Sequence, residues 1–211
     1  DTGALDKLGY EYTLVSPTEF ATVDLYKFDV LFVGWSPGDT VVDALLTRAS
    51  EIADWVATGG GIVALSEYNE LNKWAWLPLW VTSSGGYHAN IVHIIEPSHP
   101  VMVNLTDAAL SFWGDSYHGY FSNFHDYWIP LARGMEAGRS ITFAANYGKG
   151  RMAITHQDPD YHFYYGDVLG AGQLLRNMID WVWVALPEHD LAVSVSAPLY
   201  LEPNEPFVLG A

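Results

Sequence analysis

Three glycines precede a short aliphatic run in Gly59-Gly60-Gly61-Ile62-Val63-Ala64-Leu65-Ser66. A second apolar run, Phe28-Asp29-Val30-Leu31-Phe32-Val33-Gly34-Trp35, lies upstream and ends at turn-forming residues 36–39. Short, nearly continuous apolar runs that end at turn residues are typical of strands buried on both faces, as in a parallel sheet. The two runs therefore predict two strands of one buried sheet.

The segment between these strands has the spacing of a helix. Apolar residues recur there every three or four positions, which predicts a single helix over residues 42–56. Thr40 is the predicted N-cap, and the three glycines supply the C-terminal stop. A strand, a helix and a strand in this order predict the right-handed crossover unit of a parallel α/β sheet.

Further elements are predicted on both sides of this unit. Residues 71–140 are aromatic-rich and interrupted by prolines, a pattern that predicts loops and insertions around a single clear strand at 91–95. The other predicted elements are the end of a helix at 6–9, a strand at 10–15, a hairpin of strands 140–145 and 151–155 around the turn Tyr147-Gly148-Lys149-Gly150, and a helix at 168–184.

Composition excludes several classes of function. The 211 residues contain 9 Lys and Arg against 25 Asp and Glu, a formal net charge of −16, which excludes partners held by clustered cations, such as nucleic acid or an anionic membrane. The chain has no cysteine, so disulfides, thiolate metal sites and cysteine nucleophiles are excluded. No apolar run approaches the roughly 20 residues of a membrane-spanning helix, and we expect no direct membrane insertion. Half of the residues are hydrophobic, enough for one substantial folded domain.

The character of the sequence changes after Pro187. Residues 190–197 alternate between apolar and polar types, as in a half-exposed antiparallel strand, and prolines follow. We therefore divide the chain into an α/β domain, residues 1–186, and residues 187–211, a linker with the beginning of a β-sandwich-like module. An isolated two-strand piece of this kind is marginally stable in water.

The order of motifs over residues 1–186 resembles the class I glutamine amidotransferase-like superfamily, including its trehalose-utilisation-like and extracellular accessory branches. The resemblance implies a three-layer, flavodoxin-like, mostly parallel sheet with helices on both faces, plus a short C-terminal β segment. The motifs that carry it are Ala4-Leu5-Asp6-Lys7-Leu8-Gly9-Tyr10, Phe28-Asp29-Val30-Leu31-Phe32, the stretch from Gly59 to Ser66, and Tyr147-Gly148-Lys149-Gly150-Arg151.

Similar modules are appendages of large secreted proteins, notably subtilisin-like proteases, which implies an extracellular or cell-surface location. The tail from His189 resembles the opening of an immunoglobulin-like adhesion module. The sequon Asn104-Leu105-Thr106 fits an exported protein. The family's first central strand has no counterpart before the helix in residues 1–8. We therefore expect a segment of a longer polypeptide, or a protomer whose ends are completed by neighbouring copies.

The resemblance also implies a candidate catalytic triad. The family's nucleophile follows the Gly-Gly-Gly strand, a position held here by Ser66, and its late His-x-acid motif is matched by His156 and Asp158. Ser66 would be the nucleophile, His156 the base and Asp158 the orienting carboxylate. However, neither neighbour of Ser66 is glycine, and the carboxylate of Glu67 would disfavour a developing oxyanion. We therefore expect hydrogen-bonded residues at strand ends and keep the serine hydrolase as an alternative.

Two metal sites are alternatives in the same sequence. Asp115, His118 and His125 have side chains that suit Zn²⁺ or another divalent ion, with His88 and His93 upstream. Oxygen ligands for Ca²⁺ could instead come from Asp158, Asp160 and Asp167, although no glycine-centred calcium loop is present. Histidines in aromatic loops more often pack and donate hydrogen bonds, so we expect no cofactor and keep a divalent metal as an alternative.

The sequence favours a noncatalytic structural or binding module of a larger secreted or cell-surface protein. Its expected partners are other domains of the same polypeptide or neighbouring copies. A glycan-binding module is a further alternative, because tryptophan and tyrosine faces beside Asp and Asn suit stacking on sugars.

Overall fold

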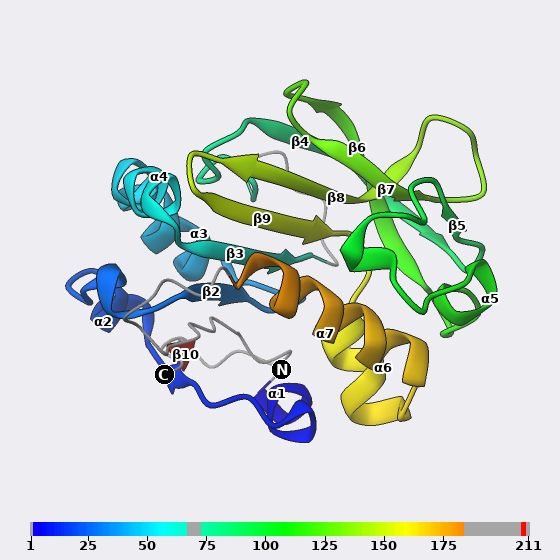
Figure 1. Ribbon diagram of the computed structural model, residues 1–211, viewed down its shortest axis with the longest axis horizontal. Helices are drawn as coiled ribbons and strands as arrows, with labels where there is room; N and C mark the ends of the chain where they lie inside the picture. Colours follow the sequence, from blue (N-terminus) through cyan, green and yellow to red (C-terminus); the bar gives the residue numbers. More distant parts are fainter. Residues whose placement is uncertain (1, 67–72, 184–207, 210–211) are drawn as a thin grey trace.

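The computed structural model describes residues 2–66, 73–183 and 208–209, which form an α/β fold around a mixed sheet (Figure 1). The helices are α1 (Thr2–Leu8), α2 (Pro17–Phe20), the 3₁₀ turn η1 (Leu25–Lys27), α3 (Asp39–Thr47), α4 (Ala49–Thr58), the 3₁₀ turn η2 (Pro100–Met102), α5 (Asp107–Leu110), α6 (Pro159–Gly166) and α7 (Leu169–Val182). The strands are β1 (Thr13–Leu14), β2 (Val30–Val33), β3 (Gly61–Leu65), β4 (Val81–Ala89), β5 (His93–Ile94), β6 (Tyr117–Phe124), β7 (Ile129–Arg133), β8 (Ser140–Tyr147), β9 (Gly150–Thr155) and β10 (Val208–Leu209).

The main sheet has a parallel core and an antiparallel remainder. Within the described residues its strand order is β2-β3-β9-β8-β6-β4, with β7 paired to β8 and β5 paired to β7. The pairs β2–β3 and β3–β9 are parallel, and the pairs from β9 onward are antiparallel. The predicted strand-helix-strand unit is confirmed, since β2 leads through α3 and α4 into β3. The sheet as a whole is mixed.

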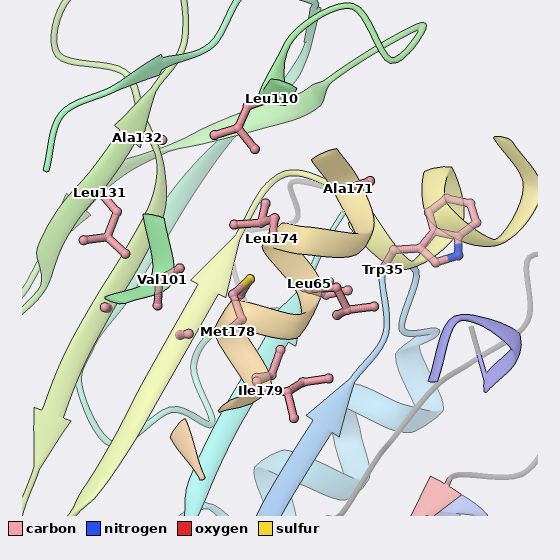
Figure 2. Packing of buried hydrophobic residues seen from close by; sticks show 14 of the residues in the cluster. Trp35, Leu65, Val101, Leu110, Leu131, Ala132, Ala171, Leu174, Met178 and Ile179 are labelled. Atoms are coloured by element: carbon pink, nitrogen blue, oxygen red, sulfur yellow. The ribbon is translucent and has the colours of Figure 1, made fainter. Parts of the chain in front are cut away.

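Alternate residues of the core strands contribute to two hydrophobic clusters. Leu31 and Ile62 belong to a cluster with buried side chains of α3 and α4, whereas Phe32 and Val63 belong to a cluster with α1 and α7. This follows from the alternation of side chains along a strand. Figure 2 shows the second cluster, in which Leu174, Met178 and Ile179 of α7 point toward the sheet. The helix predicted at residues 168–184 is therefore confirmed as α7, and its buried side packs against the sheet.

The predicted continuous helix over residues 42–56 is two helices. α3 ends at Thr47 and α4 begins at Ala49, and the residue between them, Arg48, has a φ of −111° and a ψ of 16°. The Arg48 side chain is buried, donates to the backbone oxygen of Phe20 and pairs with Glu51. A tertiary contact therefore accompanies the break. α3 also begins earlier than predicted, with Gly38 at the N-cap in place of Thr40.

The predicted hairpin between β8 and β9 is confirmed. Tyr147 pairs with Gly150, so Gly148 and Lys149 form the two-residue turn. Gly148 has a φ of +60°, and an added Cβ would lie 2.5 Å from the backbone oxygen of Ala57. The turn thus needs glycine both for its left-handed conformation and for its close approach to α4.

Residues 71–140 are more regular than predicted. Beyond the predicted strand, whose observed extent is His93–Ile94, this region contributes the long strands β4 and β6 and the shorter β7. β4 is rich in serine and glycine, types that are weak strand formers, and its pairing with β6 is interrupted by two register shifts. Pairing with a neighbouring strand, which is a tertiary interaction, stabilises β4 as a strand.

The strand predicted at residues 10–15 is present as the short β1 (Thr13–Leu14). β1 pairs antiparallel with β10, with Thr13 opposite Leu209, in a sheet separate from the main one. The strand predicted at residues 190–197 lies outside the described residues. Completion of the chain ends by neighbouring copies stays a prediction.

Candidate functional site

Ser66 and His156, two members of the predicted triad, lie at the carboxyl ends of neighbouring parallel strands. Leu65 of β3 is opposite Thr155 of β9, and the backbone nitrogen of Ser66 donates to the Thr155 oxygen at 3.0 Å. Both Ser66 and His156 are buried. The structure therefore brings the two residues to the same edge of the sheet.

The imidazole of His156 is bonded to a different serine. Its Nε2 is 2.8 Å from Oγ of Ser83 on β4, and its ring packs against Phe121 and Trp74. Burial lowers the pKa of His156 to about 3, with a further decrease from nearby His118 and an opposing contribution from the backbone of Ser66. His156 is therefore a neutral histidine enclosed by aromatic rings.

Asp158 faces two other histidines. It occupies the N-cap position of α6, but its side chain makes no capping hydrogen bond. Its Oδ1 lies 3.4 Å from Nε2 of His118 and 3.3 Å from Nε2 of His162. Burial raises the pKa of Asp158, but interactions with the two histidines outweigh that effect and hold the pKa below its ordinary value. Asp158 thus belongs with His118 and His162, which together we call the His–Asp cluster.

Three separate segments position the His–Asp cluster. His118 lies in β6, and its backbone nitrogen donates to the His156 oxygen at 3.0 Å. Asp158 follows β9, and His162 is four residues further along α6, so that both lie on one face of the helix. The ligand-type atoms of the three side chains all lie within 4.8 Å of one another.

Two half-exposed residues connect the cluster to the surface. Nδ1 of His88 is 3.0 Å from Nδ1 of His118 and 3.7 Å from Oδ2 of Asp115. The side chains of His88 and Asp115 are 50% and 48% exposed, whereas those of His118 and Asp158 are 7% and 3% exposed. The backbone oxygen of Asp115 also lies 3.2 Å from Nε2 of His162. Polar groups thus extend from the buried cluster to solvent.

The predicted metal set of Asp115, His118 and His125 is separated in the structure. His118 is near the start of β6 and His125 follows its end, and at about 3.3 Å per residue the two are roughly 20 Å apart. One ion cannot contact both histidines. Instead, His125 lies beside Trp80, while Asp115 lies near His88 and His162.

The predicted calcium ligands also have separate partners. The carboxylate of Asp160 is buried and accepts hydrogen bonds from the backbone nitrogens of Trp35 and Tyr161. Asp167 is exposed and pairs with Lys7 at 2.6 Å. Asp158, the third residue of the set, belongs to the His–Asp cluster.

The aromatic residues of the irregular region divide between core and surface. Trp74 and Trp76 are each 1% exposed and fill the core. Trp80 and Tyr127 are 55% and 67% exposed, and both rings contact the ring of His125. We call Trp80, His125 and Tyr127 the aromatic patch.

Asp158 is a predicted site residue and His162 is not, although the sequence contains one signal that links them. Asp158 and His162 have the i, i+4 spacing that aligns two side chains on a helix, and a proline at 159 suits the first helical position. No local pattern links either of them to His118, about 40 residues upstream in a different strand. The third member therefore required the tertiary structure.

Within the described part of the chain, no helix has both the length and the apolar composition needed to span a membrane. No protein-family model matches the sequence, and no curated protein matches it either.

Two solved structures are similar to this chain. A protein of Salmonella typhimurium described as "Cytoplasmic Protein STM3548" matches with a TM-score of 0.56 and 13% identity, over 79% of this chain and 78% of that one. Alpha-L-fucosidase isoenzyme 2 from Paenibacillus thiaminolyticus matches with a TM-score of 0.53 and 14% identity, over 77% of this chain and 26% of the fucosidase chain. At these identities the likeness concerns the fold alone, and this chain shares its α/β fold with both proteins.

Proposed function

We propose that this chain is a noncatalytic binding or structural module of a larger protein. The observation that carries the proposal is the pairing of the predicted triad residues. Nε2 of His156 is bonded to Ser83, while Asp158 faces His118 and His162. A general base must reach the proton that it removes, and its orienting acid must contact the base. Here base and acid have other partners, and this supports a noncatalytic role.

The amidotransferase-like, three-layer, flavodoxin-like description of the fold is part of the same proposal. It is supported by the parallel order β2-β3-β9 and by two hydrophobic clusters that draw on alternate residues of the core strands. The fucosidase chain is about four times longer than its matched region. A fold of this kind therefore occurs within a longer polypeptide, which supports the role of a module.

We further propose an extracellular or cell-surface location, with partners that are other domains of the same polypeptide or neighbouring copies. Asn104 of the sequon is exposed, as a glycosylation acceptor must be. The net charge of −16 favours solubility and disfavours nucleic-acid partners.

The alternative is a serine hydrolase in which Ser66 is activated by His156. A fluorophosphonate probe separates the two proposals, because it modifies only an activated, accessible serine. We expect no labelling of Ser66 in the folded protein, as judged by intact mass and peptide mapping. Labelling at Ser66 that is lost in Ser66→Ala, but kept in the matched control Ser122→Ala, would replace the module with the hydrolase.

The aromatic patch favours a second candidate function, glycan binding. Trp80 and Tyr127 expose large ring faces, and such faces stack on sugar rings while nearby polar groups accept or donate hydrogen bonds. Ser122, Asn123 and Asp126 are exposed residues of the adjoining segment. A glycan-binding role is compatible with a noncatalytic module.

A further inference from the structure

We propose that His118, Asp158 and His162 bind a divalent transition-metal ion, with Zn²⁺ as the best match. Two imidazoles and one carboxylate form a suitable ligand set for zinc in a protein without cysteine. The site differs from the metal set predicted from sequence, which included His125. It is also independent of the proposed function, because a module can hold an ion whether or not it performs chemistry.

The first support is the spacing of the ligand atoms. Nitrogen and oxygen ligands about 2.0–2.1 Å from a tetrahedral Zn²⁺ lie about 3.4 Å from one another. The two separations from Oδ1 of Asp158 are 3.4 Å and 3.3 Å. A charge-assisted hydrogen bond between imidazolium and carboxylate would be shorter, about 2.7–2.9 Å. The observed separations therefore fit two ligands of one ion better than two direct hydrogen bonds.

The second support is that one carboxylate oxygen of Asp158, Oδ1, is buried and, among the described residues, makes no hydrogen bond of ordinary geometry. A buried charged oxygen is costly unless it is paired or coordinates a metal. The residue also stands at an N-cap position, where aspartate normally accepts a backbone hydrogen bond, yet its side chain makes none there. Its carboxylate is directed at the two histidines instead.

The third support comes from the partners behind the histidines. Nδ1 of His118 lies 3.0 Å from Nδ1 of His88, so one of the two nitrogens carries the proton. If His118 donates, its Nε2 keeps a lone pair that faces Asp158, which is the tautomer a metal ligand needs. The half-exposed His88 and Asp115 mark the side from which an ion can enter.

One contact competes with the ion. Nε2 of His162 lies 3.2 Å from the backbone oxygen of Asp115 and can donate a hydrogen bond to it. Binding of an ion requires this nitrogen to be deprotonated, so the hydrogen bond is lost and a proton is released or moves to Nδ1. The same nitrogen is 3.3 Å from Asp158 and needs little movement to become a ligand.

A zinc titration tests the proposal. Protein dialysed against a chelator is titrated with ZnCl₂ at pH 7.5 in competition with a chromophoric chelator. We expect about one equivalent bound with a micromolar or tighter dissociation constant, and a loss of affinity of at least about 100-fold in both Asp158→Asn and His162→Gln. The matched control His125→Gln, a histidine outside the cluster, should bind zinc like the wild type.

Folding of each variant is checked by far-UV circular dichroism, and if Asp158→Asn does not fold, His162→Gln decides the result. The proposal is overturned if the wild type binds no zinc at micromolar concentrations. It is also overturned if folded His162→Gln retains the wild-type affinity, or if His125→Gln alone abolishes binding. None of these outcomes depends on the fluorophosphonate result at Ser66.

Discussion

Acidification below about pH 6.5 should destabilise the folded protein through His156, and replacing this residue should remove its share of that sensitivity. Burial lowers the pKa of His156 from 6.5 to about 3, because a charged imidazole cannot be hydrated among Trp74 and Phe121. In the unfolded chain the same imidazole is exposed to water and titrates near 6.5. The two states therefore bind different numbers of protons between these two pKa values.

Proton linkage gives the sign and size of this change in the free energy of unfolding. Between pH 6.5 and pH 3 the unfolded state carries one more proton at His156 than the folded state, so the free energy of unfolding falls as the pH falls. The slope from one such group is about 1.4 kcal/mol per pH unit. From pH 7.5 to pH 4.5, His156 should therefore lower the free energy of unfolding by about 2 to 3 kcal/mol. Above pH 7.5 it should contribute no pH dependence.

The assay is urea unfolding followed by tryptophan fluorescence at a series of pH values, with a chelator present to keep the His–Asp cluster free of metal. Asp158, Asp107 and Glu19 also have lowered pKa values, but their carboxylates take up protons mainly below pH 4.5. Burial lowers the pKa of His99 as well, so His99 adds to the slope in the same direction, and its contribution is present in both the wild type and the variant. The informative comparison is wild type against His156→Gln. The variant is expected to be less stable than the wild type at pH 7.5. Its free energy of unfolding should fall by about 2 to 3 kcal/mol less than that of the wild type between pH 7.5 and pH 4.5.

The matched control is His125→Gln, which removes a histidine from the surface and should keep the wild-type slope. Parallel curves for wild type and His156→Gln between pH 7.5 and 4.5 would refute the reasoning. An imidazole resonance of His156 that titrates near pH 6.5 in the folded protein would refute it as well.

Two further predictions concern the hairpin turn and the aromatic patch. Gly148→Ala should lower the free energy of unfolding by at least about 2 kcal/mol, because its new Cβ clashes with the backbone of Ala57 and the left-handed conformation adds strain. The control is Gly9→Ala, since Gly9 has a φ of +80° and open space around it. Measured by urea unfolding, this control should lower the free energy of unfolding by only about 1 kcal/mol. If the patch binds glycans, Trp80→Ala should abolish glycan-array signals at unchanged stability, and the exposed control Tyr165→Ala should not. Equal costs for the two glycine variants, or a wild-type protein silent on the array, would contradict these predictions.

The elements that could be predicted from the sequence are those whose residues carry a local signal. β2 and β3 are short apolar runs, α7 repeats its apolar residues with helical spacing, and glycine at 148 fits the tight turn between β8 and β9. Each signal is contained within a few residues, and each element buries the face that its spacing predicts. The crossover from β2 to β3 followed from their order alone.

Other features depend on contacts between segments distant in sequence. β4 contains Ser83, Ser84 and Gly85, which are weak strand formers, and its pairing with β6 stabilises the strand. The division of the helix at Arg48 accompanies a buried contact with Phe20, 28 residues upstream. Propensity could not indicate either outcome, because the deciding partner is not a sequence neighbour.

The candidate site also has features that the sequence predicts and features that only tertiary contacts decide. The sequence placed Ser66 and His156 each at the end of a predicted strand, and the resemblance grouped them as candidate triad residues. The structure decided that these two strands, β3 and β9, are neighbours. The sequence could not determine the partner of each side chain. His156 is paired with Ser83, and Asp158 lies beside His118 and His162. These pairings arise because β4, β6 and α6 meet at one place. Side-chain pairing depends on distances of a few tenths of an ångström, and only tertiary packing sets distances on that scale.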